Sequence, residues 1–110
     1  MSKYRWIYTT WPDAALAQAA ARSLVEERLC ACTNILPGMT SVYCWQGTVE
    51  MARETVMIVK TTADKAAPLI DRLTTLHPYD EPCVVGLEID ESASSPGFLD
   101  WMHRAVNDSA

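Results

Sequence analysis

Residues 40–62 read TSVYCWQGTVEMARETVMIVKTT, and this stretch decides the fold of the chain. Two runs rich in β-branched and aromatic residues flank a single glycine, Gly47. The pattern predicts two strands, 40–46 and 48–62, joined by a tight turn at Gln46-Gly47. The four consecutive apolar residues 56–59 indicate that the second strand is covered on both faces. The stretch therefore predicts a long β-hairpin whose second arm lies inside a sheet.

The residues before the hairpin predict a strand, a helix and a further strand. Residues 4–10 form a short run rich in strand formers, which predicts a strand. Asp13 is suited to cap a helix over 14–29. An apolar stripe of that helix is expected to face the core: Leu16, Ala17, Ala20, Ala21, Leu24 and Val25. A strand over 30–35 then leads into the hairpin through a bend or bulge at Pro37-Gly38.

The residues after the hairpin predict a helix, a strand and a last helix. The first helix is expected over 64–76 and stops at His77, because Pro78 disfavours helical geometry in the residue before it. A strand over 83–89 follows, and Ser95-Pro96 carries the signals of a helix start. Four residues of the last helix are expected to be buried: Phe98, Trp101, Met102 and Ala105.

The order of these elements predicts one α+β domain over residues 1–110. The order βαββαβ is typical of the ferredoxin-like sandwich, a four-stranded antiparallel sheet with two helices on one face, here with an added C-terminal helix. The second face of the sheet needs a cover, and the long hairpin has free edges that can pair with another chain. The sequence therefore favours a closed homo-oligomer over a monomer.

Composition excludes several classes of partner. The chain has 110 residues and a formal net charge of −5, with only nine basic residues. Binding to nucleic acid or to an anionic membrane needs clustered Lys and Arg, so neither is expected. No stretch is apolar enough to span a bilayer, and residues 1–6 lack the pattern of a secretory signal. We therefore expect a cytoplasmic protein.

The four cysteines allow two interpretations. Cys30 and Cys32 are separated by one residue, which places both sulfurs on one side of a strand and could form half of a site for copper or zinc. No second Cys or His pair with zinc-site spacing follows them, and free cysteines are commonly buried. Two core thiols are the simpler interpretation.

The segment His77-Pro78-Tyr79-Asp80-Glu81-Pro82-Cys83 is the most suggestive for function. It places an imidazole, a phenol, two carboxylates and a thiol on one loop that two prolines stiffen. His77 with Glu81 or Cys83 could bind a divalent cation or take part in acid–base chemistry. Alternatively, His77 ends the helix and Tyr79 packs at a subunit contact.

Several sequence motifs along the chain serve as anchors for a comparison with known families. The most specific anchor runs from Arg28 through Cys32-Thr33-Asn34-Ile35-Leu36-Pro37-Gly38. The further anchors are Thr10-Trp11-Pro12-Asp13, Ser41-Val42-Tyr43, Trp45-Gln46-Gly47, Glu50, Lys60-Thr61, His77-Pro78-Tyr79 with Pro82, and Phe98-Leu99-Asp100-Trp101. In their residues and their order, these anchors resemble the divalent-cation tolerance proteins of the CutA family, and the resemblance covers almost the whole chain.

The resemblance implies a ferredoxin-like subunit in a tight trimer, similar in architecture to the PII signal-transduction proteins. It also implies a role in tolerance of copper and other divalent metals, with no enzymatic reaction. Family members with a proposed copper site use a cysteine where this chain has Thr9 and two histidines where it has Leu76-His77. Cys83 stands where the family usually has Glu, and Cys30 where it usually has Ala.

These considerations set the expected site. Copper(II) or another divalent cation is the candidate ligand, in a cleft between subunits, with His77, Glu81 and Cys83 as its ligands. Four further residues are expected to bind a ligand or line an interface: Tyr79, Trp45, Lys60 and Tyr43. No catalytic residue is expected. One alternative is a PII-like small-molecule sensor or interaction scaffold without a metal role, and another is a thiol enzyme using Cys83 and His77.

Overall fold

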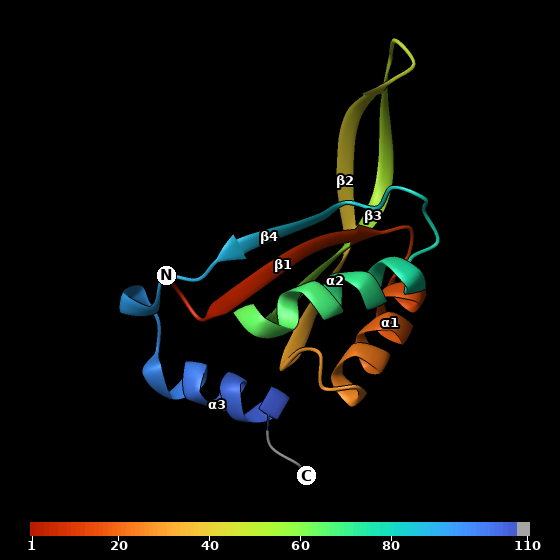
Figure 1. Cartoon of the computed structure of the whole chain (residues 1–110). Coiled ribbons are helices and arrows are strands. Elements are labelled where there is room, and N and C mark those ends of the chain that lie inside the picture. Colours follow the sequence, from red (N-terminus) through yellow and green to blue (C-terminus); the bar gives the residue numbers. More distant parts are fainter. Residues whose placement is uncertain (108–110) are drawn as a thin grey trace.

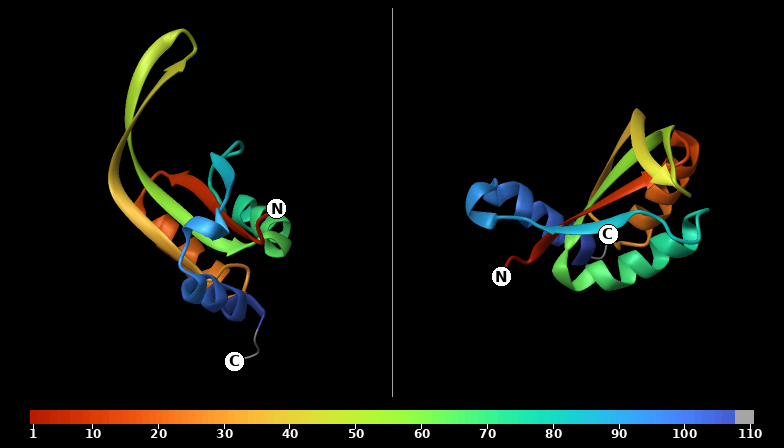
Figure 2. Two further views of the ribbon diagram at one scale, coloured as in Figure 1. Left: turned by 90° about the vertical axis from the view of Figure 1, so that its left-hand side faces the viewer. Right: turned by 90° about the horizontal axis from the view of Figure 1, so that it is seen from above.

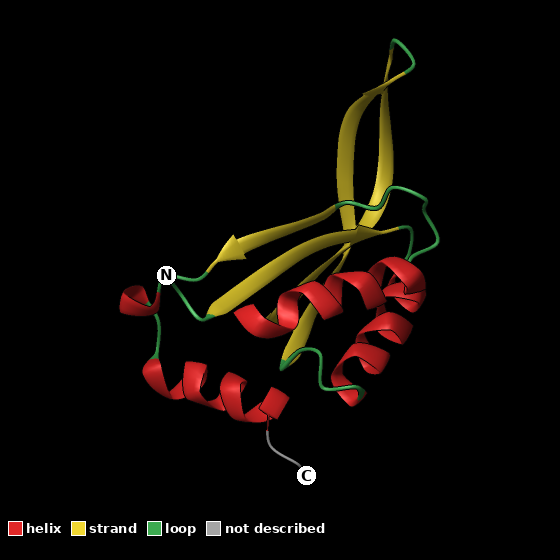
Figure 3. Ribbon diagram, in the orientation of Figure 1, coloured by secondary structure: helices red, strands yellow, loops and turns green. Residues whose placement is uncertain are grey.

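The computed structural model describes residues 1–107 and shows one four-stranded antiparallel sheet with the strand order β2-β3-β1-β4. The predicted α+β class and ferredoxin-like element order are confirmed (Figures 1 and 3). The elements are β1 (Tyr4–Trp11), α1 (Ala14–Glu26), β2 (Cys32–Trp45), β3 (Thr48–Thr62), α2 (Ala63–Leu76), β4 (Val84–Glu88), the short 3₁₀ helix η1 (Glu91–Ala93) and α3 (Pro96–Asn107).

The long hairpin turns where the sequence predicts it. Gln46 and Gly47 have φ of 49° and 82°, and Trp45 pairs with Thr48 across the turn. Two successive positive φ values match the right-handed twist of the arms, and glycine adopts such a φ without steric cost. The pairing shifts register between Leu36 and Met39, so the predicted irregularity at Pro37-Gly38 is a bulge within one continuous strand.

The main core lies between one face of the sheet and helices α1 and α2. Ile7, Met57 and Val59 are inaccessible to solvent there, together with Leu24 of α1 and Leu73 of α2. Helix α1 buries three alanines and one leucine, and these small side chains let it approach the sheet closely. Because side chains alternate along a strand, Trp6 and Tyr8 of β1 and their partners Leu87 and Val85 of β4 point to the opposite face.

Helix α1 differs from its prediction in two respects. It ends at Glu26 and not at Leu29, because the chain reverses through Arg28 at φ 58°, with Arg28 N–H donating to Val25 O and Leu29 N–H to Leu24 O. This is the Schellman arrangement of hydrogen bonds that closes a helix. The predicted burial of Leu16 and Val25 is wrong. Each lies one position, about 100°, from the buried row of Ala17, Ala20, Ala21 and Leu24.

Helix α3 forms a second, smaller cluster at one end of the sheet. Leu99 and Met102 are buried there with Tyr4 of β1. The predicted burial of Met102 is therefore confirmed. Phe98 and Trp101, also predicted to be buried, are more than two-fifths exposed. That prediction is wrong for the single chain, in which the two rings lie against each other, with centroids 5.5 Å apart, and stay partly open to solvent.

Large apolar side chains remain exposed on two surfaces. The sheet face opposite α1 and α2 exposes Trp6, Val85 and Leu87, and the outer hairpin exposes the cross-strand pair Val42 and Met51. Separately, no helix among residues 1–107 is long and apolar enough to cross a membrane.

Candidate functional site

A cleft of about 720 Å³ lies between the outer hairpin and the loop that precedes β4. The hairpin arches over this loop, which joins α2 to β4 (Figure 2). The cleft brings together four of the seven residues predicted from sequence: Tyr43, Trp45, Tyr79 and Glu81. It does not include His77, Cys83 or Lys60. We call it the hairpin cleft.

The hairpin wall of the cleft follows from strand pairing. Tyr43 pairs with Glu50, and both share a face with Glu54 because alternate residues point the same way. The Ser41 hydroxyl donates a hydrogen bond of 2.7 Å to the Glu54 carboxylate, which holds that side chain in place. The opposite face of the same arms carries Val42 and Met51. The outer hairpin therefore has one aromatic and acidic face and one apolar face.

The loop wall is held by His77, which is buried against Trp11. Their ring centroids are 4.2 Å apart, and the His77 ring lies 5.0 Å from that of Tyr79. His77 Nε2 lies 2.8 Å from Thr10 O, and the Tyr79 backbone N–H donates to Nδ1 over 3.1 Å. These contacts fix the start of the loop and place Tyr79 at the rim of the cleft.

The same contacts bear on a metal role for His77. A backbone N–H can only donate, so Nδ1 is the unprotonated nitrogen, and Nε2 carries the proton that it donates to the Thr10 carbonyl. Neither nitrogen has a lone pair left for a cation. Within residues 1–107, moreover, no three His, Cys, Asp or Glu side chains are grouped so as to hold a metal ion. His77 as a direct ligand does not fit this arrangement.

The hairpin cleft is strongly acidic. Glu50, Glu54, Asp80 and Glu81 line it, against the single guanidinium of Arg53. Burial raises the pKa of the Tyr79 hydroxyl, and the charge of Glu54 and the proximity of Tyr43 and Asp13 raise it further. The phenol at the rim of the cleft therefore stays protonated and available as a hydrogen-bond donor at neutral pH.

Lys60 lies at a different place from the cleft, on the sheet face opposite α1 and α2. Its Nζ is 5.4 Å from the ring centroids of both Trp6 and Phe98, which is cation–π range. These three side chains line a separate pocket of about 380 Å³, which Leu99 and Met102 also line. The predicted grouping of Lys60 with Tyr79 and Trp45 is therefore not found within one chain.

The four cysteines are free thiols in different surroundings. Cys30 is buried, and burial together with the neighbouring Cys32 raises the pKa of its thiol to about 12. Burial also raises the pKa of Cys32, while Lys60 lowers it. Cys44 and Cys83 are exposed. The interpretation of Cys30 as a core thiol agrees with this burial, whereas Cys32 is only half-buried.

Sequence reasoning missed four charged residues of the cleft: Glu50, Arg53, Glu54 and Asp80. A signal for two of them was present. A turn at Gln46-Gly47 pairs Trp45 with Thr48, so counting back along both arms places Glu50 opposite Tyr43, and Glu54 follows on the same face. No local sequence pattern indicates that the loop before β4, which carries Asp80, lies close to the hairpin.

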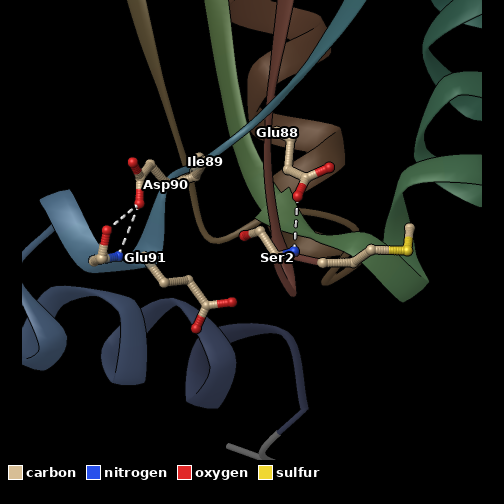
Figure 4. A pocket seen from close by; sticks show the side chains of 7 residues that line it. Ser2, Glu88, Ile89, Asp90 and Glu91 are labelled. Carbon is tan, nitrogen blue, oxygen red and sulfur yellow. Dashed lines mark hydrogen bonds between the residues drawn. The ribbon is translucent and has the colours of Figure 1, made fainter.

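A second acidic hollow, of about 430 Å³, lies at the N-terminus between Ser2 and η1 (Figure 4). Its carboxylates are engaged by the chain itself. Glu88 accepts from Ser2 N–H, Glu91 from Lys3 N–H, and Asp90 from the backbone and hydroxyl of Ser92. They serve to close the N-terminus and to cap η1.

Comparison with known proteins gives a consistent result. The family model described as "CutA1 divalent ion tolerance protein" matches residues 5–105. The divalent-cation tolerance protein CutA of Thermus thermophilus is 44% identical over 98 residues, which span 89% of this chain and 93% of that protein.

Solved structures agree over nearly the whole fold. CutA from Xylella fastidiosa superimposes with a TM-score of 0.90 at 37% identity, covering 96% of this chain and 100% of that one. CutA from Synechococcus elongatus gives 0.91 at 33% identity, with 97% and 93% covered. The chain belongs to the CutA1 divalent ion tolerance protein family.

Proposed function

We propose that the chain acts in the cytoplasm as a homotrimeric divalent-cation tolerance protein, without an enzymatic reaction of its own. The observation that carries the assembly is the exposed apolar surface. Val85 and Leu87 on the sheet face are half exposed, and Val42 and Met51 on the hairpin expose 63% and 73% of their area. Groups of large, exposed apolar side chains are typical of protein interfaces. The free thiols suit a reducing compartment.

The proposed cation site uses the exposed ligands of the loop before β4. Glu81 offers oxygen and Cys83 offers sulfur, a pair suited to a borderline or soft divalent metal such as copper or zinc. Two ligands from one chain leave the remaining positions to other subunits, which agrees with a site formed only on assembly. His77 takes the part of a positioning residue that holds the loop.

Assembly is tested by light scattering on the purified protein. The expected mass is three times that of the subunit. Met51→Glu, which introduces a charge on the apolar hairpin face, is expected to lower it, whereas Glu26→Gln on the exposed side of α1 leaves it unchanged. Trp45→Ala distinguishes between the two roles that Trp45 can have. The trimer persists if Trp45 serves only the cleft, and it weakens if Trp45 anchors the contact between subunits. A wild-type monomer contradicts the proposed assembly.

Cation binding is tested by calorimetric titration with copper(II), zinc(II) and nickel(II). Zinc is included because it has no redox chemistry and so separates binding from oxidation of the thiols. Saturable binding that Glu81→Gln and Cys83→Ser each weaken supports the proposed ligands. Binding that both variants leave unchanged, or its absence from the intact oligomer, rejects them. His103→Ala, on the exposed side of α3, is the control for nonspecific imidazole binding.

A further inference from the structure

None of the carboxylates of the hairpin cleft forms an ion pair in the part of the chain that the structure describes, and Arg53 is the one basic residue against the four acidic residues that line it. The ion pairs within residues 1–107 are Arg22 with Glu26 and Arg72 with Glu27, both on the helices. In the cleft, the Glu54 carboxylate accepts only from a neutral hydroxyl, that of Ser41. The cleft therefore presents a negative potential to any molecule that enters it, and low-dielectric walls focus such a potential.

The arrangement of these carboxylates disfavours a bare metal ion. Glu50 and Glu54 lie on the hairpin wall and Asp80 and Glu81 on the loop wall, so negative charge lines two sides of a space of about 720 Å³. No three of the described ligand side chains converge on one point. A small hard cation needs several oxygen ligands that converge on it at metal–oxygen distances of about 2.0–2.6 Å. An elongated cation with charges several ångströms apart matches a dispersed set better.

Three aromatic side chains complete the cleft. Tyr43, Trp45 and Tyr79 expose 42%, 59% and 43% of their area while lining it. Aromatic faces attract ammonium groups by cation–π interaction and provide apolar contact for methylene chains. A hydrated metal ion gains little from such surfaces. The combination of aromatic rings and dispersed carboxylates is the chemistry that recognises an organic polycation.

We propose that the hairpin cleft binds an aliphatic polyamine, with its methylene segments against Tyr43 and Trp45 and its ammonium groups paired with carboxylates on both walls. The volume falls within the range of small-molecule sites, which is about 300–1,000 Å³. The cleft shares Glu81 with the proposed divalent-cation site, but the decisive residues of this proposal, Trp45, Glu50 and Glu54, lie on the hairpin wall and are not proposed metal ligands.

Calorimetric titration of the intact oligomer with spermidine tests the proposal, with magnesium chloride as the inorganic cation control at the same ionic strength. Saturable binding is expected at one spermidine per subunit. Trp45→Leu removes the aromatic face but keeps an apolar side chain, and is expected to weaken binding about tenfold. Glu50→Gln with Glu54→Gln is expected to weaken it at least as much. Glu88→Gln, a carboxylate outside the cleft, is the matched control and leaves binding unchanged.

Three results overturn the proposal. Magnesium that competes with spermidine at equal concentration indicates diffuse attraction to acidic surface. Spermidine binding that is unchanged in Trp45→Leu excludes the aromatic contact. No binding to the intact oligomer shows that the cleft is closed on assembly. None of these results affects the copper and zinc titrations on Glu81→Gln and Cys83→Ser, so the two proposals fail separately.

Discussion

The imidazole of His77 packs on the indole of Trp11, with ring centroids 4.2 Å apart and the ring planes inclined at 34°. Trp11 is the last residue of β1 and is inaccessible to solvent; its own indole N–H donates to the Thr9 hydroxyl over 2.8 Å. A histidine beside a predicted metal loop thus forms part of the core. The contact links the end of β1 to the loop wall of the cleft.

Replacing His77 should cost stability as a core substitution does. His77→Ala removes a buried ring and leaves the Thr10 carbonyl without its donor, so the free energy of unfolding should fall by about 2–3 kcal/mol. Urea unfolding at fixed protein concentration measures it, because the stability of an oligomer depends on concentration. His103→Ala, which is exposed, should change the value by less than about 0.5 kcal/mol. Equal effects of the two substitutions would contradict the packing described for His77.

Two leucines of α1 provide a matched pair. Leu24 is inaccessible and Leu16 is 41% exposed, although the sequence pattern assigns both to the core face. Leu24→Ala should lower the free energy of unfolding by about 3 kcal/mol and Leu16→Ala by less than about 1 kcal/mol. Thermal or urea unfolding of the two variants measures the difference. A reversed order would mean that α1 is rotated about its axis.

Two glycines should respond to alanine with opposite signs. Gly47 has φ 82° in the hairpin turn, and a Cβ there is strained by about 1 kcal/mol although no atom lies within 4 Å of it. Gly97 lies in the first turn of α3 with open space around it and no positive φ. Gly97→Ala should raise the free energy of unfolding by about 0.5–1 kcal/mol. Gly47→Ala should lower the free energy of unfolding, and urea unfolding of both variants measures the two changes. A stabilising effect of Gly47→Ala would contradict the positive φ of the turn.

The cysteines should react with iodoacetamide at very different rates. Burial holds the pKa of Cys30 near 12, so at pH 8 almost none of it is thiolate, and its sulfur is inaccessible. Cys83 is exposed and should be labelled first, which peptide mass spectrometry at successive times can follow. Addition of urea should make Cys30 reactive. Rapid labelling of Cys30 in the native protein would be inconsistent with its buried position.

The parts of the fold that the sequence could predict are those set by local chemistry. The turn at Gln46-Gly47 needs two residues at positive φ, and the end of α2 follows from Pro78, so both are legible from neighbouring residues. The choice between adjacent apolar rows of α1 is not local. Leu16 and Ala17 both fit a helical stripe, and the close approach of helix and sheet selects the row with the small residue.

The candidate site was predictable only in part, for a related reason. Trp45, Tyr43, Tyr79 and Glu81 stood out by residue type, but their meeting depends on the curvature of the hairpin, which no short sequence pattern encodes. His77 illustrates the converse. Its residue type suggests a ligand, whereas two hydrogen bonds and a stacked indole engage the whole ring. Residue type indicates possible chemistry, and only the contacts decide which atoms are free for it.

The arched hairpin has a mechanical consequence. β3 pairs with β1 only from Thr55 onward, so the outer arms are a two-stranded ribbon supported at one end, in a molecule 46 Å long. Such a ribbon bends more easily than a packed core deforms, and the bulge after Leu36 gives it a point of flexure. The width of the hairpin cleft, which Trp45 and Tyr79 line, is thus set by elastic stiffness, and a molecule spanning it would act as a brace that damps the motion of the tip.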